Sequence, residues 1–200
     1  MPSILIIAGE NSGEKYGADL VRQFKKKHPE VSFFGIGGRY MEAEGVDLIY
    51  TIQDLALVGL FEIIAHLNRV RKILKHINKE VLKRHPLAAV LIDSPDFNLR
   101  LAKLLNRSSV PVLYYISPTI WAWRENRIKT IKAVVKKMLL IFPFEENIYH
   151  EYKIPAVYVG HPLKERIKTN LSEAEFFQKF GLDKNKLLIT ILPGSRKSEI

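Results

Sequence analysis

The sequence predicts an α/β fold with a doubly wound parallel sheet, in which helices cover both faces of the sheet. Short apolar segments of strand length, such as Ser3–Ala8 and Ala88–Ile92, alternate along the chain with longer segments of helical periodicity. The strand segments are apolar almost throughout rather than at every second residue. That pattern is typical of parallel strands buried on both faces, and it favours a Rossmann-like sheet.

The predicted elements follow one another in regular order, with turn residues between them. The predicted strands are Ser3–Ala8, Val31–Ile36, Val46–Thr51, Ala88–Ile92, Val110–Ile116, Met138–Ile141 and Ala156–Val159. The predicted helices run from about Tyr16 to Lys27, from about Gly59 to Arg84, and over Leu99–Asn106, Asn126–Val135 and Glu145–Tyr152. Glycines follow the first two strands, and Pro86 ends the long helix.

The pattern changes after Pro162 and divides the chain into three parts. Residues 1–163 form the predicted Rossmann-like domain. Residues 164–185 form a linker with a short helix near Ser172–Phe180, in which Ser172 is the expected N-cap. Residues 186–200 are expected to begin a second α/β domain with a strand over Lys186–Leu192. Since one strand cannot build a core, the sequence reads as a first domain followed by a truncated second one.

Composition narrows the possible functions. The 200-residue chain is 47% hydrophobic and 26% charged, as globular proteins are, and its lack of cysteine excludes disulfides and cysteine-ligated metals. The histidines lack H-x-x-x-H spacing, so no metal or other cofactor is expected. No apolar run reaches the roughly 18–20 residues of a membrane span, and the N-terminus lacks the basic region of a signal peptide. A cytoplasmic location is therefore expected.

The net charge of the chain is +10, from 31 Lys and Arg against 21 Asp and Glu. An excess of this size favours an anionic partner. Nucleic acid, a phosphorylated substrate and an anionic membrane surface all meet that description, and charge alone does not choose among them.

Two loops at predicted strand ends hold candidate polar residues. The segment AGENSGE, Ala8–Glu14, has glycines that permit close backbone approach, and the helix start that follows it attracts anions. It matches neither the dinucleotide nor the Walker A pattern, and an ordinary turn explains it equally well. In IDSPDFN, Asp96 or Asn98 can cap the next helix. Asp93 ends the buried strand facing the crevice, where a carboxylate can act as a general base.

Three further segments each have two interpretations. The tryptophans of ISPTIWAWR, Ile116–Arg124, are spaced i, i+2 in an extended loop, either as packing residues or as a crevice wall. LPGSR, Leu192–Arg196, ends in an arginine that can bind a diphosphate in bidentate fashion. The long helix carries an apolar stripe flanked by lysines and arginines. That stripe either packs on the core or lies on an anionic membrane.

Taken in order, these segments resemble one known family. The matching segments are AGENSGEKYGADL, FFGIGG, LALVGLFEII, IDSPDFN, YYISPTIWAWRENRIK, FPFE, VGHPL and LPGSR. They resemble the lipid-A-disaccharide synthases, the family 19 glycosyltransferases, from Ala8 to the end of the chain. The most specific parts are SP-x-x-WAWR and ID-x-PDFN.

The resemblance implies a GT-B architecture, with the acceptor bound mainly by the first domain and the nucleotide sugar mainly by the second. The implied reaction moves 2,3-diacylglucosamine from UDP to 2,3-diacylglucosamine 1-phosphate with inversion. It forms a β-1,6 disaccharide and releases UDP at the cytoplasmic face of the inner membrane of a Gram-negative-type bacterium. Most of the family's donor domain is absent from this sequence.

The resemblance also implies roles for single residues. Asp93 matches the family's catalytic aspartate and is the expected base for the acceptor hydroxyl. Arg196 matches the arginine of LPGSR and is expected to bind the UDP diphosphate. The other expected substrate-binding residues are Glu10, Ser12, Gly13, Asn98, Gly194 and Ser195. The residues expected to face an anionic inner-membrane surface are Leu60, Phe61, Ile63, Ile64 and Leu67.

Other functions remain alternatives. A UDP-N-acetylglucosamine 2-epimerase or the glycosyltransferase that makes lipid II would share the GT-B fold, but neither explains the WAWR segment. A basic nucleic-acid-binding domain would interleave aromatic residues with its cations. Here the cations flank an apolar stripe, so no nucleic-acid partner is expected. The third alternative is a non-catalytic acceptor-binding module.

Overall fold

The computed structural model describes residues 1–56, 63–120, 125–166 and 170–192. The chain divides into two compact units, Met1–Pro162 and Leu163–Ile200. The division falls where the sequence pattern changes, and each unit is described by itself.

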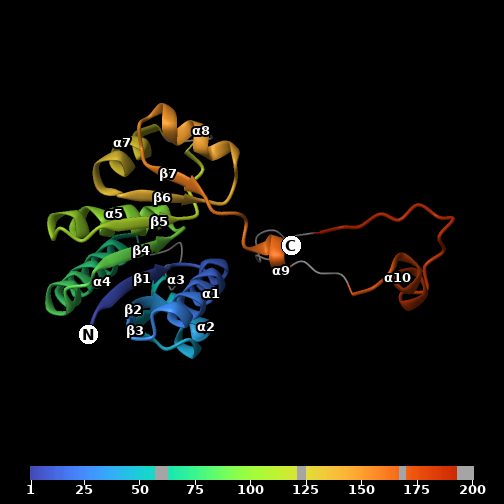
Figure 1. The fold of residues 1–200 in the computed structure, drawn as a ribbon, viewed down its shortest axis with the longest axis horizontal. Coiled ribbons are helices and arrows are strands. Elements are labelled where there is room, and N and C mark those ends of the chain that lie inside the picture. The colour runs from blue at the N-terminus through green and yellow to red at the C-terminus, as the bar shows by residue number, and fades with distance from the viewer. Residues whose placement is uncertain (57–62, 121–124, 167–169, 193–200) are drawn as a thin grey trace. The chain divides into compact units, whose positions relative to one another are not determined.

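Seven strands among the described residues form one sheet in the first unit (Figure 1). Their order across the sheet is β3-β2-β1-β4-β5-β6-β7, and all neighbours pair in parallel. The strands are β1 (Ser3–Ala8), β2 (Ser32–Gly37), β3 (Val46–Thr51), β4 (Ala88–Ile92), β5 (Val112–Tyr115), β6 (Lys137–Leu140) and β7 (Ala156–Tyr158). The chain runs from β1 to one edge and then returns to the other side of β1 with β4. The prediction of a doubly wound parallel sheet is confirmed.

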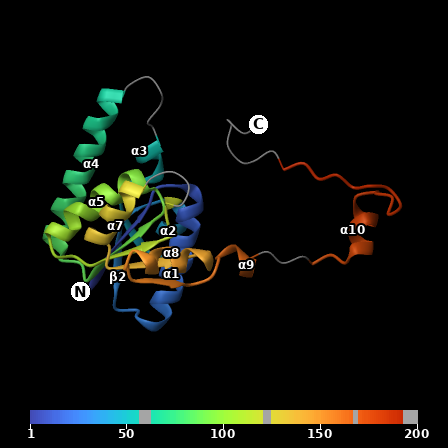
Figure 2. The same cartoon turned by 90° about the horizontal axis from the view of Figure 1, so that it is seen from above.

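Helices cover both faces of this sheet. The helices among the described residues of the first unit are α1 (Asn11–Lys27), α2 (Arg39–Ala43), α3 (Ile52–Ala56), α4 (Ile63–Arg84), α5 (Pro95–Arg107), α7 (Glu125–Val134) and α8 (Phe144–Glu151). Helices α1 and α2 supply Val21 and Met41 to the core on one face. Helices α4, α5 and α7 supply Ile77, Leu101 and Ile131 to the core on the other face. Figure 2 shows these three helices gathered on one side.

The two cores explain why the strands are apolar at nearly every residue. Leu5 and Ile7 of β1 belong to the core beneath α4, α5 and α7, whereas Ile4 and Ile6 belong to the core beneath α1 and α2. Successive side chains of a strand point to opposite faces. Each buried aliphatic side chain stabilises the fold by about 1.5–3 kcal/mol, so a strand between two helix layers gains from an apolar residue on both faces.

Two helices begin about one turn before the predicted start, and both starts shape the candidate site. Helix α1 begins at Asn11 and α5 begins at Pro95. Gly13 lies inside α1 and is buried next to Ile92 of β4. Pro95 is tolerated in the first turn of α5, because an N–H there has no intrahelical acceptor. The loops after β1 and β4 are consequently only two residues long.

The described residues of the second unit include the short helices α9 (Leu163–Arg166) and α10 (Glu173–Lys179). Ser172 caps α10: its hydroxyl accepts the N–H of Glu175, whose carboxylate accepts the N–H of Ser172 at 2.7 Å. The strand predicted over Lys186–Leu192 does not form, and Leu187 is 88% exposed. A strand needs hydrogen bonds to a neighbouring strand, and no described residue of this unit supplies one.

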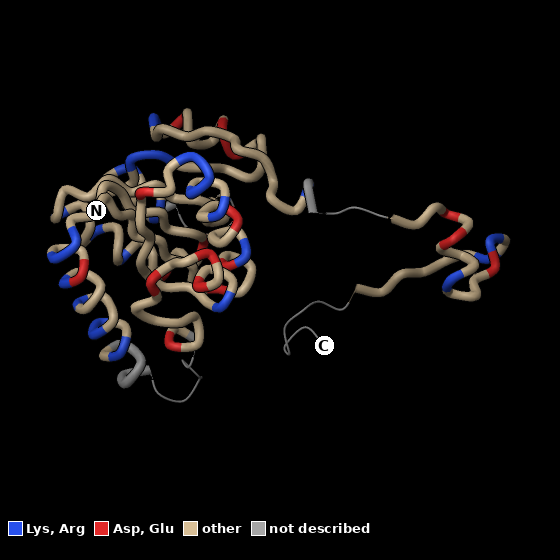
Figure 3. Tube along the Cα trace, turned by 60° about the horizontal axis from the view of Figure 1, so that its bottom comes forward, with Lys and Arg blue, Asp and Glu red and all other residues tan. Residues whose placement is uncertain are grey.

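Helix α4 is 22 residues long and strongly basic. Figure 3 shows lysines and arginines repeating along it. They are Arg69, Arg71, Lys72, Lys75, Lys79, Lys83 and Arg84. Among the helices that the structure describes, none is both long enough and apolar enough to span a membrane.

Candidate active site

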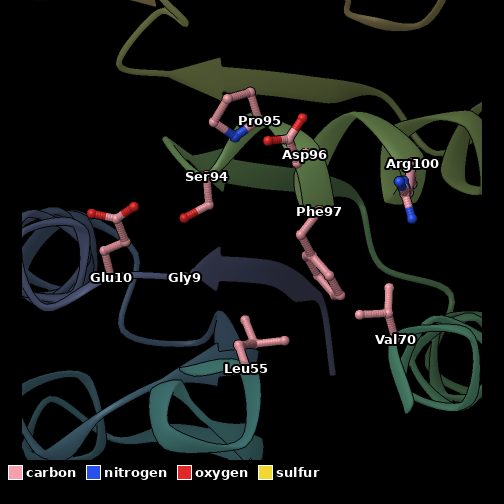
Figure 4. A pocket seen from close by; sticks show the side chains of 9 residues that line it. All are labelled: Gly9, Glu10, Leu55, Val70, Ser94, Pro95, Asp96, Phe97 and Arg100. Atoms are coloured by element: carbon pink, nitrogen blue, oxygen red, sulfur yellow. The ribbon is translucent and has the colours of Figure 1, made fainter. Parts of the chain in front are cut away.

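The strand order reverses between β1 and β4, and the helices that follow these strands lie on opposite faces of the sheet. Open α/β sheets bind ligands at such points, beyond the carboxyl ends of the strands. A pocket of about 300 Å³ lies there (Figure 4). Its lining residues are Gly9, Glu10, Leu55, Val70, Ser94, Pro95, Asp96, Phe97 and Arg100.

The pocket combines an apolar part with a polar part. The ring of Phe97 points toward the side of the pocket that Leu55 and Val70 line (Figure 4). Glu10 and Arg100 contribute charged groups to the lining. Such a surface suits a ligand that has both polar groups and hydrocarbon.

Asp96 belongs to the first turn of α5, and its carboxylate accepts a hydrogen bond from the Arg127 guanidinium of α7 at 2.7 Å. The Asp96 side chain is 77% exposed, so this ion pair contributes at most about 1 kcal/mol to stability. Ser94 occupies the N-cap position of α5. Asp96 therefore lines the pocket and joins α5 to α7, and it does not occupy the N-cap position.

Asp93 directly follows β4 and directly precedes the lining residue Ser94. Both residues have left-handed backbones, with φ of 50° for Asp93 and 44° for Ser94. This conformation costs a non-glycine residue about 1–2 kcal/mol. Two such residues in succession turn the chain sharply from strand to helix and place Asp93 directly before the pocket-lining Ser94.

The backbone of Asp93 is held by three hydrogen bonds. Its carbonyl accepts the Tyr114 hydroxyl at 2.6 Å and the Asn98 amide at 2.7 Å, and its N–H donates to the carbonyl of Tyr115 at 3.0 Å. The Asn98 amide also donates to the carbonyl of Ile92 at 3.1 Å. Asn98, predicted to bind substrate, is instead fully buried at 0% exposure and bonds the strand end.

The other predicted residues of the first unit have different surroundings. Glu10 lines the pocket, and Ser12 is exposed in the first turn of α1. Gly13 is buried, and a Cβ added to it would meet the Ile92 side chain at 3.4 Å and the Ala8 Cβ at 3.7 Å. These are ordinary van der Waals distances, so the packing of α1 against β1 and β4 does not require glycine at this position, and the role of Gly13 in substrate binding stays a prediction.

Gly9 and Ser94 bring the two loops of the pocket into contact. A Cβ added to Gly9 would lie 2.3 Å from the Ser94 hydroxyl oxygen. Figure 4 shows the Ser94 side chain directed toward Gly9. The absence of a side chain at Gly9 is therefore required for this arrangement of the pocket.

Sequence reasoning missed the role of Glu14. This carboxylate is 5% exposed and accepts the backbone N–H of Tyr40 at 2.7 Å, at the start of α2. A Cβ added to Gly38 would lie 2.5 Å from a Glu14 carboxylate oxygen. The last residue of AGENSGE and the last glycine of FFGIGG thus form one structural contact. A glutamate one helical turn after the loop was the available signal.

A second buried polar group lies beyond the carboxyl ends of β5 and β6. The Ser117 and Tyr149 hydroxyls are 2.7 Å apart, and the Glu145 carboxylate accepts the N–H of Phe142 at 3.2 Å. Burial raises the pKa of Glu145 above its usual value. Ile116, between β5 and this group, is also left-handed with φ of 68°. The start of the loop that leads to the WAWR segment is therefore held by the contact between Ser117 and Tyr149.

Several predicted residues fall outside the described residues. They are Leu60, Phe61, Gly194, Ser195 and Arg196, together with the WAWR segment at residues 121–124. Ile63, Ile64 and Leu67 belong to α4, but their side chains are also outside the description. Within the part of the chain that is described, no group of three or more His, Cys, Asp or Glu side chains can hold a metal ion.

The sheet resembles those of several solved structures at low sequence identity. A UDP-GlcNAc 2-epimerase from Neisseria meningitidis superposes with a TM-score of 0.59 at 10% identity, covering 90% of this chain and 53% of that one. A glycosyltransferase from Rickettsia africae superposes with a TM-score of 0.57 at 15% identity, covering 92% of this chain and 50% of that one. These likenesses concern the fold alone.

Sequence comparison is more specific. The lipid-A-disaccharide synthase of Koribacter versatilis is 48% identical over 201 residues, which are 100% of this chain and 53% of the relative. That of Myxococcus xanthus is 43% identical over 199 residues, 100% of this chain and 52% of the relative. The chain thus spans about half the length of these curated relatives. Residues 4–200 match the family model described as lipid-A-disaccharide synthetase. The chain belongs to the lipid-A-disaccharide synthetase family.

Proposed function

We propose that the full-length protein transfers 2,3-diacylglucosamine from UDP to 2,3-diacylglucosamine 1-phosphate, and that the first unit binds the acceptor. The pocket between the β1 and β4 loops is the observation that carries this proposal. It lies at the switch point of the sheet, it combines polar and apolar lining residues, and Asp93 stands next to its lining. Family membership supports the reaction class.

The proposed step is a displacement at the anomeric carbon of the donor sugar. The acceptor 6-hydroxyl oxygen forms a bond to that carbon while the bond to the UDP phosphate oxygen breaks, and UDP leaves with the electron pair. Asp93 accepts the proton of the hydroxyl, as a general base within reach of its substrate does. Attack opposite to the leaving group inverts the anomeric centre and gives the β-1,6 linkage.

The polarity of the pocket matches the parts of such an acceptor. Leu55, Val70 and Phe97 offer an apolar surface for an acyl chain near the sugar. Arg100 offers a cation for a phosphate, because guanidinium binds phosphate in bidentate fashion. Gly194, Ser195 and Arg196 are proposed to bind the UDP diphosphate of the donor, on the strength of the LPGSR match.

A peripheral position on the cytoplasmic face of the inner membrane follows from the same substrates, whose acyl chains belong in a bilayer. The basic surface of α4 supports contact with anionic lipid. The proposed membrane contacts are Leu60, Phe61, Ile63, Ile64 and Leu67 at and before the start of α4.

The test uses a chain of the relatives' full length that begins with residues 1–200, supplied with the UDP donor and the 1-phosphate acceptor. Asp93→Asn preserves the shape of the side chain and removes the base, so kcat should fall by about 10²–10⁴-fold. Asp47→Asn is the matched control, because this exposed carboxylate binds Arg84 at 2.6 Å near the opposite ends of the strands. Near wild-type kcat for Asp93→Asn would falsify the base assignment. Loss in Asp96→Asn alone would move the role to Asp96.

A further inference from the structure

We propose that Asn98 and Tyr114 are positioning residues, which hold Asp93 in its reactive geometry by clamping its backbone carbonyl. This inference rests on the proposed role of Asp93 as the base. The two residues, together called the carbonyl clamp, act through Asp93 and never touch the substrate.

The clamp holds a conformation that the chain does not prefer. Asp93 and Ser94 are both left-handed, and neither is a glycine. Residues of this kind persist only where the surroundings over-determine them, and they cluster at active sites. Without the clamp, the turn would relax toward an ordinary backbone conformation and would carry the Asp93 carboxylate with it.

The two arms of the clamp reach Asp93 from different elements. Tyr114 comes from the neighbouring strand β5, and its hydroxyl donates to the Asp93 carbonyl at 2.6 Å. Asn98 comes from the first turns of α5, and its amide donates to the same carbonyl at 2.7 Å and to that of Ile92 at 3.1 Å. Both carbonyl lone pairs of Asp93 are thereby used, which fixes the peptide plane in two directions.

Both arms are buried, which excludes direct contact with a substrate. Asn98 and Tyr114 are each 0% exposed. Burial holds the pKa of the Tyr114 phenol well above its usual range, so its hydroxyl is protonated and can donate near neutral pH. Two donor bonds to carbonyls also define the orientation of the Asn98 amide, because the reversed amide would face those carbonyls with an oxygen.

The nitrogen and the oxygen of the Asn98 amide differ in their hydrogen bonds. Its Oδ1 atom is buried and has no hydrogen-bond partner among the described residues. An unpaired buried acceptor costs free energy, but an apolar residue here would remove a donor from the carbonyls of Ile92 and Asp93. The amide instead supplies the two donors that the strained turn requires.

The test is Tyr114→Phe in a chain of the relatives' full length, because this change removes one hydroxyl and keeps the buried ring. A displacement of the base by about 1 Å costs up to roughly 100-fold in rate. We therefore expect kcat to fall between about 10- and 100-fold, with the KM values of donor and acceptor nearly unchanged. Tyr149→Phe is the matched control, since Tyr149 is another fully buried tyrosine whose hydroxyl bonds Ser117 at 2.7 Å. It should lose similar thermal stability and keep its kcat.

A double variant distinguishes an effect of Tyr114 on the position of Asp93 from a general loss of structural order. If Tyr114 acts through Asp93, Tyr114→Phe should lower the residual rate of an Asp93→Asn enzyme less than about twofold, because coupled residues are non-additive. Asn98→Ser, judged on its folded fraction, is a second test with the same expectation. Two results would contradict the role of the carbonyl clamp and leave Asp93 as the base. One is a wild-type kcat in folded Tyr114→Phe. The other is a fall in rate that is as large in the Asp93→Asn background as in the wild type. A wild-type kcat in the single variant Asp93→Asn would instead contradict the assignment of Asp93 as the base.

Discussion

Gly9 is the position at which one methyl group tests the geometry of the pocket most directly. A Cβ on Gly9 would lie 2.3 Å from the Ser94 hydroxyl oxygen and 2.7 Å from the Ser94 Cβ, whereas carbon atoms in contact normally lie about 3.5–4.0 Å apart. Gly9 is not left-handed, so an alanine there meets no backbone strain. The lower freedom of alanine in the unfolded chain offsets only part of the clash. Overpacking of this kind costs about 1–3 kcal/mol. Gly9→Ala should therefore lower the free energy of unfolding of the first unit by about that amount.

A second substitution shows whether the clash is the cause. Ser94→Gly removes both atoms that the new methyl group meets, and the next neighbour is the Leu55 Cδ1 at an ordinary 3.8 Å. Ser94→Gly alone should be close to neutral, because relief of the left-handed strain offsets the greater freedom of glycine in the unfolded chain. The double variant should then recover most of the loss, and the coupling energy should be about 1–3 kcal/mol.

The assay is urea and thermal unfolding of the four proteins, followed by circular dichroism. A loss of about 1–3 kcal/mol corresponds to a decrease in Tm of roughly 2–12 °C for a domain of this size. The same urea midpoint for Gly9→Ala and the wild type would show that the loops do not meet as described. A loss that persists in the double variant would place the cause at another neighbour.

The remaining predictions concern the buried acid and the membrane. The raised pKa of Glu145 means that the native state holds this proton more tightly than the unfolded state, so stability falls as pH rises above about 4.5. Glu145→Gln removes that dependence, and its Tm relative to the wild type should rise between pH 4 and pH 8, measured at roughly one-unit steps; a constant difference contradicts this reasoning. Replacing Phe61, Ile63 and Ile64 together by serine should weaken sedimentation with phosphatidylglycerol vesicles and leave Tm unchanged. Unfolding instead means that the stripe is core.

The strands and their order of appearance were predictable because burial on both faces leaves a local signal. A fully apolar run such as Ala88–Ile92 predicts a central parallel strand without knowledge of its neighbours. The starts of α1 and α5 were not predictable in the same way, because Gly13 and Pro95 usually indicate loops. Pro95 is helical because the first turn of a helix tolerates proline. Gly13 is helical within α1, where it is buried next to β4. The strand predicted at Lys186–Leu192 fails because it depends on a partner strand.

The sequence predicted where the candidate site lies, but it did not predict the contacts of the individual residues. Asp93 follows a buried strand, and that position follows from the sequence. The distinction between Asp93 and Asp96 in the structure comes from nonlocal partners: Asp93 is held by β5, and Asp96 pairs with Arg127 of α7. Asn98 was expected to bind substrate on the strength of the family resemblance. Its burial, decided by the packing of α5, gives it another role.

The positions of the left-handed residues explain why the backbone geometry of the site could not be predicted from the sequence. Among the non-glycine examples in the described residues, His85, Ser109 and Lys153 lie one or two residues after the ends of helices, where a left-handed residue is common. The other three, Asp93, Ser94 and Ile116, follow β4 and β5 at the pocket end of the sheet.

The residue types at a strand end do not predict a left-handed conformation that costs about 1–2 kcal/mol per residue. This conformation depends on contacts with residues that are distant in the sequence. Tyr114 and Asn98 hold the carbonyl of Asp93, and the bare backbone of Gly9 accommodates the side chain of Ser94. One two-residue turn is thus fixed from the neighbouring strand, from its own helix and from the opposite loop. In the proposed mechanism, the reactivity of Asp93 therefore depends in part on Tyr114 and Asn98, which are buried away from the pocket.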